Sequence, residues 1–366
     1  MLRQYKLRDY KFRLIIWVIA LSVLGILIIG SANSDYKTRQ IAGLILGIAA
    51  MIFVSLWDYT WVLNFYWLIY IVSTVLLALV LLIGKNVNGA TRWINIGFQF
   101  QPSDIVKIML ILFLAKFFEV REDRVSKVKT IFFSLLLIGI QLFLIFKEPD
   151  LSTTIVVAIV FCCIIFMAGL SYKIVAGILI VLIPIAIIFM SIIMQPDQTM
   201  IQSYQLTRIY AWLRPDEYPQ ESYQQENSKK AIGSGQLYGK GLNNDDVDSV
   251  KNGNFIPEPQ TDFIFAVAGE ELGFIGCLGI ILLEFLIALE CLLIGRRAKV
   301  LSGTLICTGI AALIFFQSFV NISVATGILP NTGITLPFVS YGLTSLISFC
   351  IGIGFVLNVG LQTRKR

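Results

Sequence analysis

Long apolar runs, separated by shorter polar segments, make up most of the chain. A membrane-spanning helix needs roughly 20 mainly apolar residues, and ten runs approach or exceed that length. Their centres lie near Ala20, Ile48, Val75, Leu112, Leu137, Ile159, Ile183, Leu282, Ala312 and Ile351. The pattern predicts an all-α polytopic membrane protein with ten transmembrane helices. Because no soluble domain follows the first run, we expect that run to remain a membrane helix rather than a cleaved signal peptide.

The Lys and Arg residues between these runs predict the orientation, because they accumulate on the cytoplasmic side of a membrane. They are abundant in residues 1–13, 121–129, 296–299 and 364–366, which fall on one side of the ten-helix pattern. The alternate short segments carry few of them, at Lys37, Arg39, Lys85, Arg92 and Lys147. Both termini are therefore expected in the cytoplasm, and residues 1–13 form a basic cytoplasmic tail.

One connecting segment is much longer than the others, and the alternation of sides places it outside the cell. It runs over residues 195–261, between the seventh and eighth apolar runs. We expect the whole chain, 1–366, to form a single membrane domain. Loops longer than about 15 residues are usually functional or disordered. The Tyr, Trp and Phe residues of this segment favour an ordered loop that lies on the membrane surface.

Two shorter outer segments also carry structural signals. Apolar side chains alternate along Trp93–Phe100, which predicts an extended stretch. Pro102 suits the first turn of the helix that follows. After the Pro- and Gly-containing turn at 327–333, Pro337 is expected to start the last helix.

The composition limits the possible chemistry. Hydrophobic residues make up 57% of the chain and charged residues 14%, and there is no histidine. The usual catalytic triads and the commonest general base are therefore excluded. Six cysteines lie inside apolar runs without metal-site spacing, which predicts lipid-facing or packing roles for Cys162, Cys163, Cys277, Cys291, Cys307 and Cys350. The net charge of +6 is explained by the cytoplasmic segments, so nucleic-acid binding is not expected.

Charged residues inside the apolar runs are functional candidates, because exposing them to lipid costs several kcal/mol. Asp104 and Lys107 lie three residues apart at the outer end of the fourth run, where they can pair on one helical face. Two interpretations stay open at this point. The pair can fix helix packing, or Lys107 can bind an anionic ligand.

The densest polar cluster is Pro257–Gly273, where the long loop re-enters the membrane. Thr261 is expected to cap the new helix, which places Asp262 in the first helical turn. Asp262 then either complements the helix dipole or serves as a reactive carboxylate. A glycine-rich segment, Gly233–Gly241, lacks the spacing and the final Ser or Thr of a phosphate loop.

The chain resembles the SEDS proteins, the RodA, FtsW and SpoVE group of bacterial cell-wall glycosyltransferases. The resemblance covers nearly the whole sequence. It is carried by six ordered blocks, which are Asn88–Ile94, Phe100–Asp104 with Lys107, Lys147–Thr153, Ala231–Gly235, Pro257–Gly273 and Leu336–Gly342. The compact chain, with its short basic N-terminus, favours the RodA-like branch.

The resemblance implies polymerisation of lipid II, the undecaprenyl-pyrophosphate disaccharide-peptide, at the outer face of the bacterial cytoplasmic membrane. It implies that Asp262 is the catalytic residue. It further implies substrate-binding or positioning roles for Arg92, Lys107, Asp104, Asp150, Glu258, Ser340 and Tyr341. A divalent cation, Mg²⁺ or Mn²⁺, can assist, and a class B penicillin-binding protein transpeptidase is the expected partner, along with other elongation or division proteins.

The sequence also departs from the family's usual pattern. Gln260 stands where the family usually has His, Asp104 where it has Glu, and Glu148 and Asn227 where it has Gln. Leu343 and Thr344 follow Gly342 where Gly-Ser is usual. Two other classes of function stay open: a lipid II flippase, which fits ten spans with intramembrane charges, and a non-catalytic scaffold, which fits the loss of the histidine.

Overall fold

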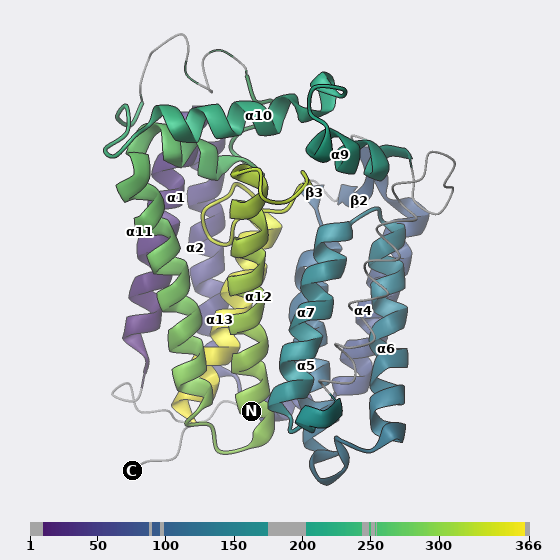
Figure 1. The fold of residues 1–366 in the computed structure, drawn as a ribbon. Coiled ribbons are helices and arrows are strands. Elements are labelled where there is room, and N and C mark those ends of the chain that lie inside the picture. Colours follow the sequence, from purple (N-terminus) through teal and green to yellow (C-terminus); the bar gives the residue numbers. More distant parts are fainter. Residues whose placement is uncertain are drawn as a thin grey trace.

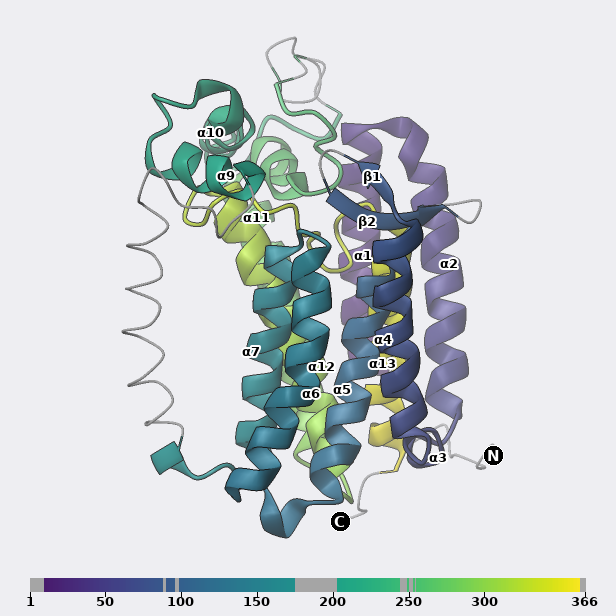
Figure 2. The same cartoon turned by 90° about the vertical axis from the view of Figure 1, so that its right-hand side faces the viewer.

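The chain folds into a bundle of long helices with two further helices lying across one end (Figures 1 and 2). The computed structural model describes residues 10–87, 90–95, 99–174, 203–243, 249, 253 and 255–362. The described helices are α1 (Phe12–Ala32), α2 (Ser34–Leu56), α3 (Tyr59–Leu63), α4 (Tyr66–Ile83), α5 (Pro102–Glu119), α6 (Val128–Lys147), α7 (Leu151–Met167), α9 (Ser203–Leu213), α10 (Pro219–Ser234), α11 (Ile264–Gly295), α12 (Leu301–Ala325) and α13 (Leu343–Leu361), with a short 3₁₀ helix, η2, at Glu122–Arg124.

Long helices stand at each predicted position that the structure describes. Among the described residues, seven of them are long and apolar enough to cross a membrane. Two further helices coincide with predicted spans: α5, which contains Asp104 and Lys107, and the shorter α7. The predicted span centred on Ile183 lies outside the described residues.

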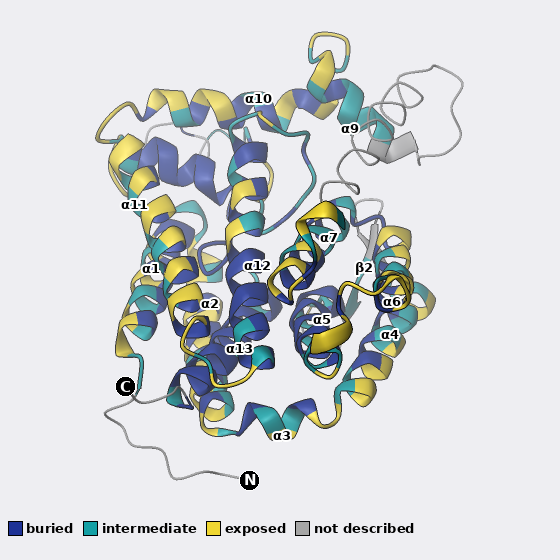
Figure 3. Cartoon of the chain, turned by 60° about the horizontal axis from the view of Figure 1, so that its bottom comes forward, coloured by how far each residue is buried: buried dark blue, intermediate teal, exposed yellow. Residues whose placement is uncertain are grey.

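Burial divides the bundle into inner and outer helices. In Figure 3 most of α12 and α13 is coloured as buried, whereas the outward faces of peripheral helices are exposed. The exposed residues of α11 are large and apolar, including Phe274, Leu278, Leu282 and Phe285. Such apolar faces are unfavourable in water and favourable in lipid. The chain is therefore a multi-pass membrane protein.

A small antiparallel sheet interrupts the helical architecture, so the all-α prediction is corrected. Its strands are β1 (Lys85–Val87), β2 (Ala90–Asn95) and β3 (Gln99–Phe100), in the order β1-β2-β3. Ile94 pairs with Phe100 across β2 and β3. The alternating pattern thus correctly predicted extended backbone at both strands. It could not predict the pairing, because pairing depends on the turns that bring the strands together.

The two prolines at predicted helix starts behave differently. Pro102 occupies the first turn of α5, as predicted. Pro337 does not start a helix, because the chain turns through Pro337–Ser340 and α13 begins only at Leu343. The hydroxyl of Ser340 accepts a hydrogen bond from the amide of Leu336 at 2.8 Å, which stabilises this turn.

The glycine-rich segment, Gly233–Gly241, forms hydrogen bonds to both sides of a break in α11. The helix breaks at Gly273, whose φ of 65° and close approach to the backbone of Gly239 exclude any side chain. On one side of the break, the amide of Lys240 donates to the carbonyl of Glu270 at 2.9 Å. On the other side, the amide of Phe274 donates to the carbonyl of Gln236 at 2.8 Å. The glycine-rich segment thus has a structural role: it provides hydrogen-bond partners for backbone groups that the break leaves without helical ones.

Candidate active site

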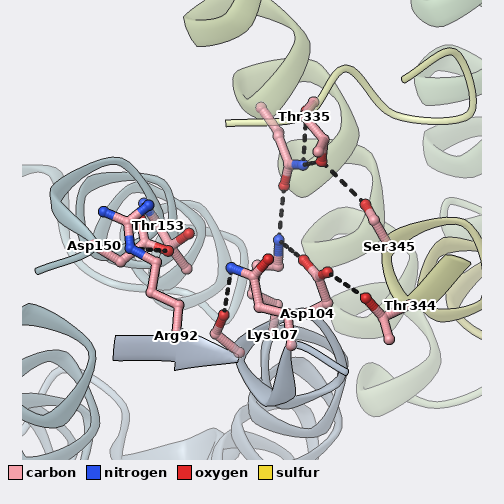
Figure 4. Close-up of polar contacts among 11 residues, drawn as sticks. Arg92, Asp104, Lys107, Asp150, Thr153, Thr335, Thr344 and Ser345 are labelled. Carbon is pink, nitrogen blue, oxygen red and sulfur yellow. Dashed lines mark hydrogen bonds and ion pairs between the residues drawn. The ribbon is translucent and has the colours of Figure 1, made fainter. Parts of the chain in front are cut away.

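Residues from distant parts of the sequence meet at the end of the bundle where the sheet and α9 lie. Arg92 comes from β2, and Asp150 is the N-cap residue of α7 (Figure 4). Asp262 immediately precedes α11, and Thr332 and Gly333 belong to the segment between α12 and α13. Motifs that the sequence placed in separate blocks therefore come together in one region.

The backbone of Asp262 is held by two polar side chains of neighbouring segments. The side-chain amide of Asn321, in α12, donates to the carbonyl of Asp262 at 2.8 Å and to that of Ile334 at 2.6 Å. The hydroxyl of Ser340 donates to the carbonyl of Thr261 at 2.7 Å. These bonds fix the turn that carries Asp262 from both sides.

Two of the predicted site residues therefore support Asp262 through its neighbours. The amide of Tyr341 donates to the carbonyl of Gln260 at 2.9 Å, directly next to the bond from Ser340 to Thr261. The hydroxyl of Ser340 is already engaged with two backbone groups. Substrate contact by Ser340 and Tyr341 stays a prediction, and their described bonds are ones that position Asp262.

The predicted helix cap at Thr261 is wrong. The helix α11 begins at Ile264, its N-cap residue is Phe263, and no side chain caps it. The hydroxyl of Thr261 turns back to donate to the carbonyl of Glu258 at 2.8 Å. Asp262 consequently lies in a turn before the helix, and its carboxylate does not cap the helix end.

The carboxylate of Asp262 has an unusually high proton affinity for an aspartate that faces cations. Burial raises the pKa of Asp262 to about 6, against the opposing effect of Arg208 and then Arg92. Asp150 and Glu258 add smaller contributions that raise this pKa further. Among the described residues, none donates a hydrogen bond to this carboxylate. The group is thus mainly ionised at pH 7 and is basic enough to accept a proton.

Arg92 is oriented by the start of α7 and the end of α6. Its Nε donates to the carbonyl of Glu148 at 3.3 Å, and its Nη2 donates to the carbonyl of Pro149. The Nε also lies 3.9 Å from a carboxylate oxygen of Asp150. The other Asp150 oxygen accepts from the amide of Thr153 at 3.0 Å, so Asp150 caps α7 and orients Arg92 at once.

Glu148 lies beside this arginine, and its side chain is completely buried. Neither of its carboxyl oxygens has a hydrogen-bond partner among the described residues. Burial raises the pKa of Glu148 to about 9, Asp150 adds to the shift, and Arg92 opposes it. Glu148 is therefore a neutral acid at pH 7. Since a protonated carboxyl resembles an amide in shape and charge, the departure from the family's usual Gln is chemically small.

Asp104 and Lys107 form a closed ion pair within the bundle (Figure 4). The Nζ of Lys107 lies 2.9 Å from Asp104 and donates to Gln317 of α12 at 3.0 Å. Thr344 of α13 donates to Asp104 at 3.3 Å. Lys107 is only 4% exposed. The geometry favours the packing interpretation of this pair, and phosphate binding by Lys107 stays a prediction.

A small pocket opens beside Asp262. It is lined by side chains and backbone of Arg92, Pro149, Leu151, Arg208, Ile209, Pro330, Asn331 and Thr332. Arg208 and Thr332 were not identified from the sequence. A Cβ atom at Gly333 would lie 3.2 Å from an Asp262 carboxylate oxygen and 3.8 Å from Arg92, so this glycine lets the segment approach both groups.

The remaining predicted residue, Glu258, is exposed and acts on Asp262 only through its charge. Among the described residues, no group of three or more acidic, Cys or His side chains is arranged to hold a metal ion. Mg²⁺ is commonly bound by one or two carboxylates together with substrate phosphates. Asp150 already accepts from the amide of Thr153 and lies beside Arg92, so Asp262 is the site carboxylate that would hold such a cation together with a phosphorylated substrate.

The fold and the site thus define a multi-pass membrane protein with a carboxylate and two arginines around a pocket at one end of its bundle. The family model FtsW/RodA/SpoVE, described as cell cycle protein, matches residues 11–365. The chain belongs to this family.

Curated relatives of the chain carry the name FtsW. A probable peptidoglycan glycosyltransferase FtsW of Buchnera aphidicola is 38% identical over 82% of this chain and 73% of its own length. One of Coxiella burnetii is 34% identical over 98% of both chains. The expected RodA-like branch is therefore not supported, because compactness of the chain does not separate the branches.

Solved structures show the same architecture. A chain from a peptidoglycan synthase complex that coordinates polymerization and crosslinking has a TM-score of 0.81 and 30% identity, over 96% of this chain and 97% of that one. The rod shape determining protein RodA of Thermus thermophilus has a TM-score of 0.72 and 28% identity, over 98% of each chain. The likeness extends over nearly all of the molecule.

Proposed function

We propose that this chain polymerises lipid II into glycan strands at the outer face of the bacterial cytoplasmic membrane. The activity class, peptidoglycan glycosyl transfer, is the one that its family relatives carry by name. In this proposal the chain has ten spans and two cytoplasmic termini, and the pocket beside Asp262 faces outward. The balance of Lys and Arg between alternate segments supports that orientation.

The reaction joins a sugar hydroxyl to an anomeric carbon. The 4-hydroxyl oxygen of one lipid II attacks the anomeric carbon of another chain end, the new glycosidic bond forms, and the bond from that carbon to the lipid diphosphate breaks. The hydroxyl proton passes to the carboxylate of Asp262, and the diphosphate leaves with the bonding electron pair. A positioned base typically contributes about 10²- to 10⁴-fold to such a step.

The observation that carries the proposal is the setting of Asp262. Its carboxylate has a pKa near 6 and lies close to the positive charges of Arg208 and Arg92, which line the neighbouring pocket. A base and a cationic site for a departing phosphate are the two parts that the reaction needs. In this scheme Arg92 contacts the diphosphate, and Asp150 orients Arg92.

The expected protein partner is a class B penicillin-binding protein, which supplies the crosslinking activity. The structural neighbour from a peptidoglycan synthase complex supports such pairing. The FtsW names of the relatives favour a role in cell division over elongation.

The test uses the purified full chain with its cognate partner and labelled lipid II. We expect polymer from the wild type and none from Asp262→Ala or Asp262→Asn, with unchanged thermal unfolding. The control is Asp216→Asn in the long loop, which we expect to polymerise normally. Polymer from both Asp262 variants would contradict the assignment of the base.

Two alternatives predict other outcomes of the same assay. A flippase moves lipid II across liposome membranes and yields no polymer from the wild type. A scaffold yields neither polymer nor transport. The outer-end position of the acidic and basic groups supports catalysis over transport, since a transport path needs charges along its length.

A further inference from the structure

The pocket beside Asp262 is lined by two arginines from different parts of the chain. Arg92 belongs to β2, whereas Arg208 belongs to α9 of the long loop. Arg208 opposes the rise in the pKa of Asp262 more strongly than Arg92 does. The positive charge of Arg208 therefore acts on the carboxylate of Asp262.

Two hydrogen bonds hold α9 over the segment between α12 and α13. The Nη1 of Arg208 donates to the carbonyl of Asn331 at 3.2 Å. The indole Nε1 of Trp212, one helical turn further on, donates to the carbonyl of Gly327 at 2.9 Å. Both acceptors are backbone carbonyls, so these two bonds position Arg208 beside the pocket.

An unpartnered hydroxyl lies in the same pocket wall. The Oγ1 of Thr332 is buried and has no hydrogen-bond partner among the described residues. A buried polar atom without a partner is costly unless a ligand or water completes its bonding. Thr332 immediately follows Asn331, which accepts the Arg208 bond, and precedes Gly333, where an added Cβ atom would lie 3.2 Å from an Asp262 carboxylate oxygen.

Arg92 alone is poorly matched to a diphosphate. Part of its charge is shared with Asp150 at 3.9 Å, and two of its donors are used by backbone carbonyls. Lys107 does not line the pocket and is satisfied by Asp104 and Gln317. A group that carries several negative charges needs a second cation, and guanidinium groups suit phosphate oxygens because they present paired donors.

We infer that Arg208 is the second diphosphate-binding cation of the pocket, with Thr332 as an additional hydrogen-bond donor. This inference rests on the proposed function. It makes the long loop a part of the substrate site: α9 supplies one wall of the pocket that receives the leaving group. A lipid monophosphate, which has one phosphate fewer, would use only one of the two arginines.

The experiment measures how undecaprenyl diphosphate and undecaprenyl monophosphate bind to the full chain in its complex. Binding is followed by displacement of labelled lipid II and, separately, by inhibition of polymerisation. We expect Arg208→Ala to weaken undecaprenyl diphosphate binding by about 10-fold or more. We expect Arg208→Lys to recover part of this loss, and binding of the monophosphate to change less than binding of the diphosphate. Thr332→Val should weaken diphosphate binding by a few-fold.

Two matched variants separate ligand binding from anchoring and from general charge. Trp212→Phe removes the indole bond to Gly327 but keeps an aromatic ring, and Arg214→Ala removes an exposed arginine that pairs with Glu217 just after α9. We expect Arg214→Ala to bind both lipids as the wild type does. Equal losses in Trp212→Phe and Arg208→Ala would overturn the inference, because the effect would then come from anchoring.

The displacement assay also separates this inference from the proposed function. If the wild type polymerises lipid II and Arg208→Ala binds the diphosphate normally, the inference fails and the proposed function stands. If the wild type forms no polymer yet Arg208→Ala loses diphosphate binding, the proposed function fails and the anion site remains.

Discussion

Two charged clusters lie near the same end of the bundle, and they differ in how completely their groups are paired. In the first, Lys107 contacts both Asp104 and Gln317 at about hydrogen-bond distance, and it is almost entirely buried. In the second, the Nε of Arg92 lies 3.9 Å from a carboxylate oxygen of Asp150, and Arg92 lines a pocket next to Asp262.

The difference distinguishes a packing role from a chemical one. The first cluster continues through Gln317 to Thr335 and then to Ser345, so it joins α5, α12 and the start of α13 (Figure 4). Each of these side chains has a polar partner within the protein. The second cluster keeps basic and acidic groups available to a ligand. An ionisable group inside a membrane protein is therefore diagnostic of function mainly when its partners are incomplete.

Breaking the closed pair should have the largest effect on folding. Lys107→Met leaves the carboxylate of Asp104 buried without its cation, and we expect a loss of about 3–5 kcal/mol in the free energy of unfolding. The measurement is thermal and denaturant unfolding in detergent. The double variant Asp104→Asn with Lys107→Met should recover most of the loss, because no unpaired charge remains. A stable single variant would contradict the packing role.

Weakening the second cluster, formed by Arg92, Asp150 and Asp262 and called the open cluster below, should instead reduce activity. Arg92→Lys keeps the charge but loses the planar pair of donors, and we expect kcat/KM for lipid II to fall by about 10²-fold. The melting temperature should change little, since Arg92 and Asp150 are not in close contact. Steady-state polymerisation and unfolding on the same preparation give both values. Lys129→Ala, in a distant basic segment, serves as the control for loss of charge.

The pH dependence of polymerisation should report the carboxylate of Asp262. The ionised group is the active base, so activity should fall as pH drops through the pKa near 6. Arg208→Ala removes the strongest effect that lowers this pKa, so the acid limb should move to higher pH. A pH series of kcat/KM for both proteins measures the shift. An acid limb at the same pH in both would show that the limb belongs to another group.

The smallest effect is expected at Gln260, which stands where the family usually has His. Its side chain is 3% exposed and its Oε1 has no partner among the described residues. We expect Gln260→His to change the polymerisation rate by less than about tenfold, below the contribution of a positioned proton carrier. Activation of an otherwise silent wild type by this substitution would favour the scaffold function.

Most of the helical framework could be predicted from the sequence, because a spanning helix leaves a long apolar run. The part of the chain that the structure describes has helices at the expected places and extended backbone at β2 and β3. The failures occur where short-range hydrogen bonds form a turn in place of the expected helix start. Thr261 bonds to Glu258 rather than capping α11, and Pro337 lies in a turn fixed by Ser340.

The candidate site was only partly predictable. Asp262, Arg92 and Asp150 lie in motif blocks that the resemblance identified, and they do meet in space. Arg208 and Thr332 carry no such signal, because their proximity depends on how α9 packs on a segment more than a hundred residues away. A single arginine in an amphipathic stretch of a polar loop is most often a solvated residue.

The most direct test compares polymer formation by two variants, one in each cluster. Asp262→Asn and the double variant Asp104→Asn with Lys107→Met are assayed with the partner and labelled lipid II, at equal folded fractions. We predict that Asp262→Asn forms no detectable polymer, whereas the double variant retains at least about one-tenth of wild-type activity, because it alters packing rather than the base. Polymer from Asp262→Asn, with none from the folded double variant, would contradict the assignment of chemistry to the open cluster.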